Sequence, residues 1–309
     1  MAREWVSSGL GCSSMSTHEG SSKLALGTVQ FGLAYGVANR QGQVSRAQAA
    51  LIVDQARRAD IRTLDTAIAY GTSEQVLGSL DLDGLDIVTK LPALPDDCTD
   101  VAGWVSAQLD ESLARLGVTA VNGLLLHRPG QLLEARGAAL FQAMESQREQ
   151  GRVKRIGISI YAPAELDALC ERYHFDLVQA PFNIMDDRLA ESGWLDRLHE
   201  RGTDLHVRSV FMQGLLLMPE GTRPQAFDRW ADRWRIWQSW LDDTGLTPLQ
   251  ACLRHALAVP QIEKVVVGVD SPAQLADIIA AAEGQCPRRP DAIGCTDESL
   301  LNPSLWNLS

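Results

Sequence analysis

The first half of the chain carries four residues of the types that a proton-transfer site needs: Asp65, Tyr70, Lys90 and His127. A lysine ammonium near a phenol lowers the pKa of the phenol, and a carboxylate orients the lysine and balances its charge. A tyrosine tuned in this way can give a proton to a carbonyl oxygen while hydride arrives at the carbon, and can take the proton back in the reverse reaction. A histidine beside it can hold the carbonyl oxygen by a hydrogen bond. These residue types predict carbonyl–alcohol chemistry.

Each of the four also has a structural interpretation that involves no chemistry. Asp65 can cap the turn before Tyr70, where the tyrosine ring packs. Lys90 can be a charge at a barrel rim, and His127 a core histidine that bonds backbone groups. For any one residue the structural interpretation is favoured, because short motif matches often arise by chance. Their order at successive strand ends favours a site instead. No other nucleophile–base arrangement emerges, since Ser159 has no evident histidine partner and Gly-x-Ser-x-Gly is absent.

The elements that must position these residues alternate in type along the chain. Short runs rich in Val, Ile and Leu, typical of strands buried on both faces, span 24–32, 61–67, 86–91, 121–127, 155–160, 177–182, 204–210 and 264–269. Segments with helical spacing of apolar residues lie between them at 47–59, 101–116, 132–150, 164–172, 194–201, 247–258 and 272–282. Eight such units predict a single (β/α)8 TIM barrel. The alternative is an open doubly wound sheet, but the turn at 32–36 lacks the Gly-rich spacing that such a sheet normally carries.

A TIM barrel carries its chemistry at the carboxyl ends of its strands and in the loops that follow them. This rule places Asp65, Lys90 and His127 at the ends of the second, third and fourth strands, with Tyr70 in the second loop. The later strand ends carry further candidates: Ser159, Gln179, Asn183, Arg208, Gly268 and Asp270.

The composition excludes several classes of protein. Of the 309 residues, 45% are apolar and 22% are charged, so wholesale disorder is excluded. The formal charge of −11 and the absence of Lys/Arg runs argue against binding to nucleic acid or to an anionic membrane surface. No apolar stretch approaches the roughly 18 residues that a spanning helix needs. We therefore expect no nucleic-acid partner and no membrane partner.

Two regions are predicted along the chain. The first 22 residues contain seven Ser and three Gly and lack a secretory signal pattern, which predicts a disordered arm over 1–22. No change in composition divides the rest, which predicts one domain over 23–309. The six cysteines lack metal-ligand spacing, so we expect no metal site and a reduced, cytoplasmic protein, although an even number of cysteines permits disulfides.

Several stretches around the four candidate residues resemble the signature of the aldo-keto reductase family. They are Leu64-Asp65-Thr66-Ala67-Ile68-Ala69-Tyr70-Gly71 with Ser73-Glu74, then Val88-Thr89-Lys90, then Leu126-His127. The resemblance runs from about Lys23 to the end of the chain. It implies a (β/α)8 barrel and NAD(P)H-dependent reduction of an aldehyde or ketone, or the reverse, with the four residues as the catalytic set. In this family a histidine at the His127 station goes with carbonyl reduction, and an acid there goes with reduction of carbon–carbon double bonds.

Later stretches resemble the cofactor-binding segments of the family. Ser159 and Gln179 match residues that bond the nicotinamide amide. The stretch 208–215 matches the segment over the nicotinamide and pyrophosphate, and 267–275 matches the segment at the adenosine end. The resemblance therefore implies a set of cofactor-binding residues: Ser159, Gln179, Arg208, Ser209, Gln213, Gly214, Gly268, Asp270 and Gln274.

Some positions depart from the family pattern. Ile160 stands where many members have Asn, and Arg208 stands where many stack a Tyr on the nicotinamide, although a guanidinium can also stack on a ring. Gly268 and Gln274 are uncharged where many members bind the 2′-phosphate of NADP with Lys and Arg, and Asp270 would repel a phosphate. Both NADP(H) and NAD(H) therefore remain open as cofactors.

Other basic residues offer an alternative phosphate site, namely Lys264, Arg288 and Arg289. A second conspicuous set, Trp230, Trp234, Trp237 and Trp240, falls on one helix face. The favoured interpretation of this stripe is a helix packed by bulky apolar residues. The alternative is an aromatic wall over the substrate, which would suit sugar rings or apolar carbonyl compounds.

The function favoured by these observations is reduction of an aldehyde or ketone, with a sugar-derived carbonyl as the substrate suggested by analogy. One alternative is a cofactor-binding regulatory protein with little turnover, and another is a TIM-barrel isomerase or lyase without nicotinamide. The expected partner is a small carbonyl or alcohol substrate, and the expected assembly is a monomer or small homo-oligomer.

Overall fold

The computed structural model describes residues 22–37, 39 and 42–306. The predicted arm over 1–22 falls outside these residues except for Ser22. Eight parallel strands form a closed barrel in which each strand pairs with the next and the eighth pairs with the first, which confirms the predicted fold class. The strands are β1 (Leu24–Gly27), β2 (Thr63–Asp65), β3 (Asp86–Leu91), β4 (Val121–Leu126), β5 (Val153–Ser159), β6 (Leu177–Pro181), β7 (Asp204–Arg208) and β8 (Lys264–Gly268).

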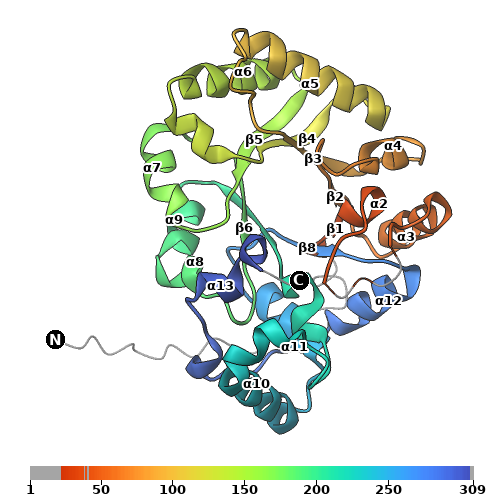
Figure 1. Cartoon of the computed structure of the whole chain (residues 1–309). Helices are drawn as coiled ribbons and strands as arrows, with labels where there is room; N and C mark the ends of the chain where they lie inside the picture. Colours follow the sequence, from red (N-terminus) through yellow and green to blue (C-terminus); the bar gives the residue numbers. More distant parts are fainter. Residues whose placement is uncertain (1–21, 38, 40–41, 307–309) are drawn as a thin grey trace.

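Helices surround the barrel on its outside (Figure 1). Those of the described chain are α2 (Val29–Gly32), α3 (Arg46–Arg58), α4 (Ser73–Gly78), α5 (Val101–Leu116), α6 (Gly137–Glu149), α7 (Glu165–Arg172), α8 (Arg188–Glu191), α9 (Trp194–Glu200), α10 (Ala231–Thr244), α11 (Pro248–Leu257), α12 (Pro272–Ala281) and α13 (Glu298–Leu301). Shorter 3₁₀ turns are η1 (Pro129–Leu133), η2 (Met212–Leu217), η3 (Gln225–Trp230), η4 (Asp291–Ile293) and η5 (Pro303–Leu305). No helix in these ranges is long and apolar enough to cross a membrane.

Local signals explain where several helices begin and end. The Thr247 hydroxyl accepts a hydrogen bond from the Gln250 amide while the Gln250 side chain accepts one from the Thr247 amide, which forms a capping box at the start of α11. The Ser271 hydroxyl caps α12 in the same position. Gly117 adopts a left-handed conformation, with φ of 68°, directly after α5. The predicted ends of these three helices are confirmed to within about a residue.

Among the predicted segments, two differ from the structure in more than their end residues. The apolar run 24–32 is a strand only as far as Gly27, and the rest of it includes the one-turn helix α2. All of β1 is buried, as are three of the four residues of α2, so periodicity does not separate the two states. The predicted helix 132–150 is divided into η1 and α6. A Cβ atom on Gly137 would lie 1.9 Å from the Leu132 carbonyl oxygen, so only glycine permits this sharp approach of the chain.

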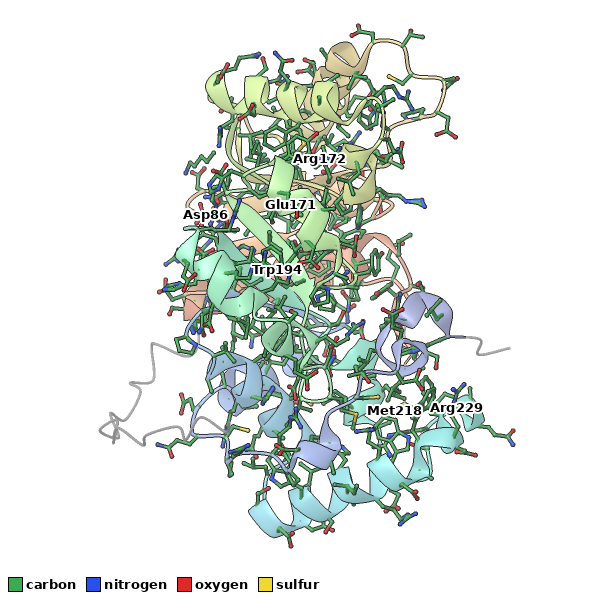
Figure 2. The ribbon with its side chains drawn as sticks, turned by 90° about the vertical axis from the view of Figure 1, so that its left-hand side faces the viewer. Asp86, Glu171, Arg172, Trp194, Met218 and Arg229 are labelled. Carbon is green, nitrogen blue, oxygen red and sulfur yellow. The ribbon has the colours of Figure 1, made fainter. Side chains whose placement is uncertain are left out.

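The apolar core has two main parts. The larger part lies between the barrel and its surrounding helices, and the smaller part joins α10 to η2 and the final segment. The smaller part contains Trp234, Trp237 and Trp240, which are at most 8% exposed, with Trp230 partly buried against it. In Figure 2, Met218 and Arg229 mark this region at the lower right, while Asp86 at the start of β3 lies on the left side. The tryptophan stripe is therefore core packing, as the favoured interpretation predicted.

Candidate active site

A cavity of about 620 Å³ opens at the carboxyl ends of the strands. Its lining includes Asp65, Tyr70 and His127, together with residues from the loops after β1, β5, β7 and β8. The position of this cavity is the one that the barrel rule predicts. Lys90 does not line the cavity and is fully buried beside it.

Asp65 and Lys90 form a buried ion pair at the ends of β2 and β3. The Lys90 ammonium donates to both carboxylate oxygens of Asp65 at 2.8 Å and to the Thr66 carbonyl oxygen at 2.9 Å. Burial lowers the pKa of Lys90, and the charge of Asp65 opposes this shift. The ammonium thus has three acceptors, and its charge is matched by the carboxylate at contact distance. The predicted pairing of these two residues is confirmed.

Tyr70 has a raised pKa, whereas the sequence predicted a lowered one. Burial raises the pKa of Tyr70 most, and the negative charge of Asp65 raises it further. The Lys90 nitrogen lies 5.2 Å from the centre of the Tyr70 ring, yet its charge is already paired with Asp65. The predicted tuning is therefore wrong in sign. The phenol of the described chain is fully protonated at neutral pH, and its chemistry is that of a proton donor.

His127 lies beside Tyr70 in the cavity. Their ring centres are 5.7 Å apart and the ring planes are inclined at 67°. Burial first, and then the charge of Lys90, lower the pKa of His127 to about 4, so the imidazole is neutral at physiological pH. Its ring lines the cavity and has no hydrogen bond to any described residue. This contradicts the interpretation of His127 as a core histidine satisfied by backbone groups, and leaves a neutral donor facing the cavity.

The loop that carries Tyr70 is held by buried hydrogen bonds. The Ser73 hydroxyl donates to the Thr28 carbonyl oxygen at 2.9 Å, and the Ser73 amide donates to the Tyr70 carbonyl oxygen at 3.0 Å. A Cβ atom on Gly32 would lie 1.7 Å from that same Tyr70 oxygen, so α2 packs against the loop only because this residue is glycine.

Glu74 anchors the helix that follows this loop. Its carboxylate is 2% exposed and accepts hydrogen bonds from the hydroxyls of Thr89 and Ser112 at 2.7 and 2.6 Å. The Arg115 guanidinium supplies the opposite charge at 2.8 Å. Glu74 thus connects α4 to the strand that carries Lys90 and to α5. The Ser73-Glu74 pair of the sequence is explained by these contacts, which no local pattern identifies.

Ser159 and Gln179 lie beneath the cavity rather than on its surface. The Gln179 amide nitrogen donates to Asp65 at 2.6 Å, and the Ser159 hydroxyl donates to the Gln179 amide oxygen at 3.4 Å. Both side chains are at most 2% exposed, and neither lines the cavity. The structure brings them together with Asp65, while their implied contact with the nicotinamide amide stays a prediction.

The other residues of the implied cofactor set all line the cavity: Arg208, Ser209, Gln213, Gly214, Gly268, Asp270 and Gln274. The loop after β7 takes an unusual course, with positive φ values at Ser209 (63°), Gln213 (53°) and Gly214 (91°). Non-glycine residues in this region of φ are uncommon and tend to occur at functional sites. At the other end of the cavity, the Gln274 side-chain oxygen accepts a hydrogen bond from the Asp270 backbone amide at 2.7 Å.

Several cavity residues were not identified from the sequence, among them Thr28, Gln30, Tyr35, Tyr161, Leu249, Asp277 and Ser304. Thr28 and Gln30 directly follow β1, and Tyr161 follows β5, so the barrel rule points to them once the strand ends are known. Leu249 and Ser304 come from distant segments, and no local pattern brings them to the cavity.

The cavity presents several groups that suit a dinucleotide. The buried Gln30 amide oxygen has no hydrogen-bond partner within the described chain, which leaves a polar group for a ligand to bond. A Cβ atom on Gly268 would lie 2.5 Å from the Gln30 side chain, so any larger residue here would displace the Gln30 amide. Arg208 supplies a cation, and the capped amino end of α12 lies at the same cavity. These groups fit a nicotinamide dinucleotide.

The alternative phosphate ligands are engaged elsewhere and do not line the cavity. The Lys264 ammonium donates to the Ser22 carbonyl oxygen at 2.6 Å. Arg288 and Arg289 pair with Asp291 and Asp187. The described chain also holds no group of three or more side chains that would bind a metal ion.

Comparisons with known proteins agree with this geometry. A sequence model of the aldo/keto reductase family matches residues 23–288. The chain is 28% identical over 285 residues to D-threo-aldose 1-dehydrogenase from a Pseudomonas species, over 79% of this chain and 86% of that protein. It is 32% identical over 127 residues to 6-dehydroglucose reductase from Agrobacterium fabrum, over 35% of this chain and 42% of that protein.

Solved structures share the fold. An aldo-keto reductase from Bacillus halodurans, in its holo form, aligns with a TM-score of 0.69 at 20% identity and covers 92% of this chain and 93% of its own. One from Pseudomonas aeruginosa aligns with a TM-score of 0.62 at 21% identity, over 84% of this chain and 89% of its own. At these identities the likeness concerns the barrel alone.

Proposed function

The chain belongs to the aldo/keto reductase family, and from this premise we propose that it is an NAD(P)H-dependent oxidoreductase that interconverts an aldehyde or ketone and its alcohol. The observation that carries the proposal is that Tyr70 and His127 face one cavity, next to the buried pair of Asp65 and Lys90. A neutral imidazole donor and a fully protonated phenol side by side suit a carbonyl oxygen, which accepts hydrogen bonds and becomes more basic as hydride arrives.

The nicotinamide of the bound cofactor supplies the hydride in reduction and accepts it in oxidation. Tyr70 donates the proton to the substrate oxygen in reduction, and the same phenol oxygen takes the proton back in the reverse direction. His127 holds the substrate oxygen with one hydrogen bond, which strengthens as negative charge develops there. The ion pair of Asp65 and Lys90 supports the buried side of the site next to Tyr70. Because the two charges cancel, the pair adds no net charge beside the phenol.

We propose a sugar-derived carbonyl or lactol as the substrate class. Two relatives carry the names D-threo-aldose 1-dehydrogenase and 6-dehydroglucose reductase, which concern sugar substrates of those proteins. The rings of Tyr35 and Tyr161 line the cavity and are 40% and 44% exposed, so each ring offers aromatic surface that can pack on a sugar ring. The small-molecule partner, the cytoplasmic location and a monomer or small homo-oligomer remain predictions.

For the cofactor we propose a weaker preference for NADP(H) over NAD(H) than is usual in the family. Arg208 is the only described cation that lines the cavity, and the expected phosphate-binding positions hold Gly268 and Gln274 beside the acidic Asp270. Gln274→Arg is expected to shift the ratio of kcat/KM values toward NADPH by about 10- to 150-fold, since a hydrogen bond to a charged group contributes about 1.5–3 kcal/mol. A wild-type enzyme already strongly selective for NADPH would contradict this proposal.

One experiment tests the function as a whole. The protein is titrated with NADPH and with NADH while its tryptophan fluorescence is followed, and then nicotinamide absorbance is followed with a panel of aldoses, aldehydes and ketones. We expect binding of at least one cofactor and turnover with members of the panel. Absence of binding would overturn the proposal, and binding without turnover on any carbonyl would favour the regulatory alternative.

A further inference from the structure

Arg208 brings an unpaired positive charge into the cavity. The guanidinium is half-buried at the end of β7, where Nη2 donates to the Ile160 carbonyl oxygen at 2.9 Å and Nη1 donates to the Ser209 hydroxyl at 3.3 Å. Its central carbon lies 4.8 Å from the centre of the Tyr161 ring. These contacts are all with uncharged groups, and no carboxylate of residues 22–37, 39 and 42–306 forms an ion pair with it. The side chain is held in place without being neutralised.

The charge of Arg208 acts at the reacting end of the cavity. Burial is the largest cause of the shifted pKa values of Tyr70, Lys90 and His127, and Arg208 contributes to all three by favouring the deprotonated form. By contrast, the pKa of Asp270 is raised by burial and lowered by its hydrogen bond with Gln274, with no contribution from Arg208. Arg208 therefore acts at the end of the cavity where hydride is transferred rather than at the end that contains Asp270.

The nicotinamide ring differs by one charge between its two redox states. The oxidised ring carries one positive charge and the reduced ring carries none. A fixed cation in a half-buried site repels the former and leaves the latter nearly unaffected. Attraction between the cation and the cofactor pyrophosphate is the same in both states, so it does not contribute to the difference.

Resting on the proposed function, we infer that Arg208 makes the cavity bind the reduced cofactor more tightly than the oxidised cofactor, and thereby biases the enzyme-bound equilibrium toward alcohol oxidation. In that direction the alcohol C–H bond breaks and its hydride, with two electrons, passes to the oxidised ring, which becomes neutral. The hydroxyl proton passes to the Tyr70 oxygen in its deprotonated form, which the charge of Arg208 favours, and the substrate becomes the carbonyl compound. The overall equilibrium in solution is unchanged, because the bias is confined to the bound state.

The test measures dissociation constants of binary complexes, so it does not depend on turnover. NADH and NAD⁺ are titrated calorimetrically into the wild-type protein, Arg208→Gln, Arg208→Lys and Arg58→Gln. The glutamine retains an N–H donor for the Ile160 carbonyl oxygen and removes the charge. Arg58, with 78% of its side chain exposed on α3, is the matched control for loss of one charge elsewhere.

We expect the wild type to bind NADH at least tenfold more tightly than NAD⁺. In Arg208→Gln this ratio falls at least tenfold, which corresponds to about 30 mV in the potential of the bound two-electron couple. Arg208→Lys retains most of the ratio, and Arg58→Gln retains all of it.

Three results would overturn the inference. If Arg208→Gln weakens NADH and NAD⁺ equally, the residue binds the pyrophosphate or shapes the cavity without discriminating between redox states. If the wild-type protein binds NAD⁺ as tightly as NADH, the inference fails whatever the variants show. In both cases the proposed function stands, whereas a wild-type protein that binds neither NADH nor NAD⁺, nor the NADPH pair, overturns the proposed function as well.

Discussion

Residue types alone predict that Tyr70 belongs to the site, but they do not predict the direction of its pKa shift. The sequence places an aspartate, a tyrosine, a lysine and a histidine at successive strand ends, and the structure brings them together. The direction of the pKa shift was not accessible in the same way, because it is set first by burial of the phenol and then by the negative charge of Asp65. The Lys90 ammonium is shared between Asp65 and the Thr66 carbonyl, so the phenol experiences burial and the carboxylate rather than a free cation.

Replacement of the phenol tests its role as proton donor. Tyr70→Phe removes only the hydroxyl, so the buried ring and the loop around it are retained. We expect kcat to fall by about 10²–10⁴, the usual scale of general acid catalysis, while the dissociation constant for NADPH or NADH changes little. The measurements are steady-state kinetics and a fluorescence titration. Near-normal turnover would remove Tyr70 from this role.

His127→Ala separates a catalytic from a structural role. The ring has no hydrogen bond to the described chain, so its loss is expected to lower kcat strongly and the melting temperature little.

Because a neutral donor at this place suits carbonyl reduction, the wild-type product from an α,β-unsaturated ketone is expected to be the unsaturated alcohol. A saturated ketone as the main product would contradict the assignment, as would a large loss of stability with kcat retained.

At the scale of elements, the order of strands and helices was predictable and some boundaries were not. Buried parallel strands stand out as short Val/Ile/Leu runs, and the predicted limits of β3 agree with the structure. The turn from β1 into α2 was missed because nearly all of this segment is buried, so no polar face marks the change. Contacts between distant elements were also inaccessible, such as the carboxylate of Glu74 joining α4, β3 and α5.

The opposite end of the barrel depends on an ionic network between β5, β7 and β8. Burial raises the pKa of Glu263, but the hydrogen bond and charge of His206 and the charge of Arg155 outweigh this effect and hold the pKa at about 2. Arg155 also pairs with Asp204 at 2.6 Å. Because the folded-state pKa lies below 4.5, the ordinary value for a glutamate, this carboxylate stabilises the fold above about pH 5. That contribution is lost as the pH falls toward 2.

Glu263→Gln is therefore expected to lower the melting temperature at pH 7 and to have progressively less effect as the pH falls from about 5 to 2. Thermal unfolding at several pH values checks this. Glu111→Gln serves as the control, because it breaks only an exposed i,i+4 pair with Arg115 and should have a small effect throughout. A difference between wild type and Glu263→Gln that stays constant down to pH 2 would contradict the linkage.

At the scale of the whole molecule, the two parts of the apolar core have different relations to the site. The larger part supports the barrel, whereas the smaller part packs against the loop that carries Gln213 and Gly214. Met212, Leu215 and Leu216 of this loop belong to the same cluster as the tryptophans of α10. The sequence predicted that the tryptophan stripe is buried but not what it packs against, because periodicity identifies a buried face and not its partner.

This arrangement predicts that the stability of the second core is coupled to cofactor binding. Trp237 is fully buried, and its ring centre lies 5.8 Å from that of Trp240. Trp237→Ala is expected to lower the free energy of unfolding by about 3–5 kcal/mol, the usual range for a buried tryptophan. The loop after β7 loses its support at the same time, so we expect weaker NADH or NADPH binding and a smaller effect on kcat.

Trp104 on α5, on the opposite side of the barrel in Figure 1, offers the control, since Trp104→Ala should lower stability without weakening cofactor binding. Urea unfolding and calorimetric titration of each variant measure the two quantities, and unchanged cofactor affinity in Trp237→Ala would mean that the second core stabilises the protein independently of the site.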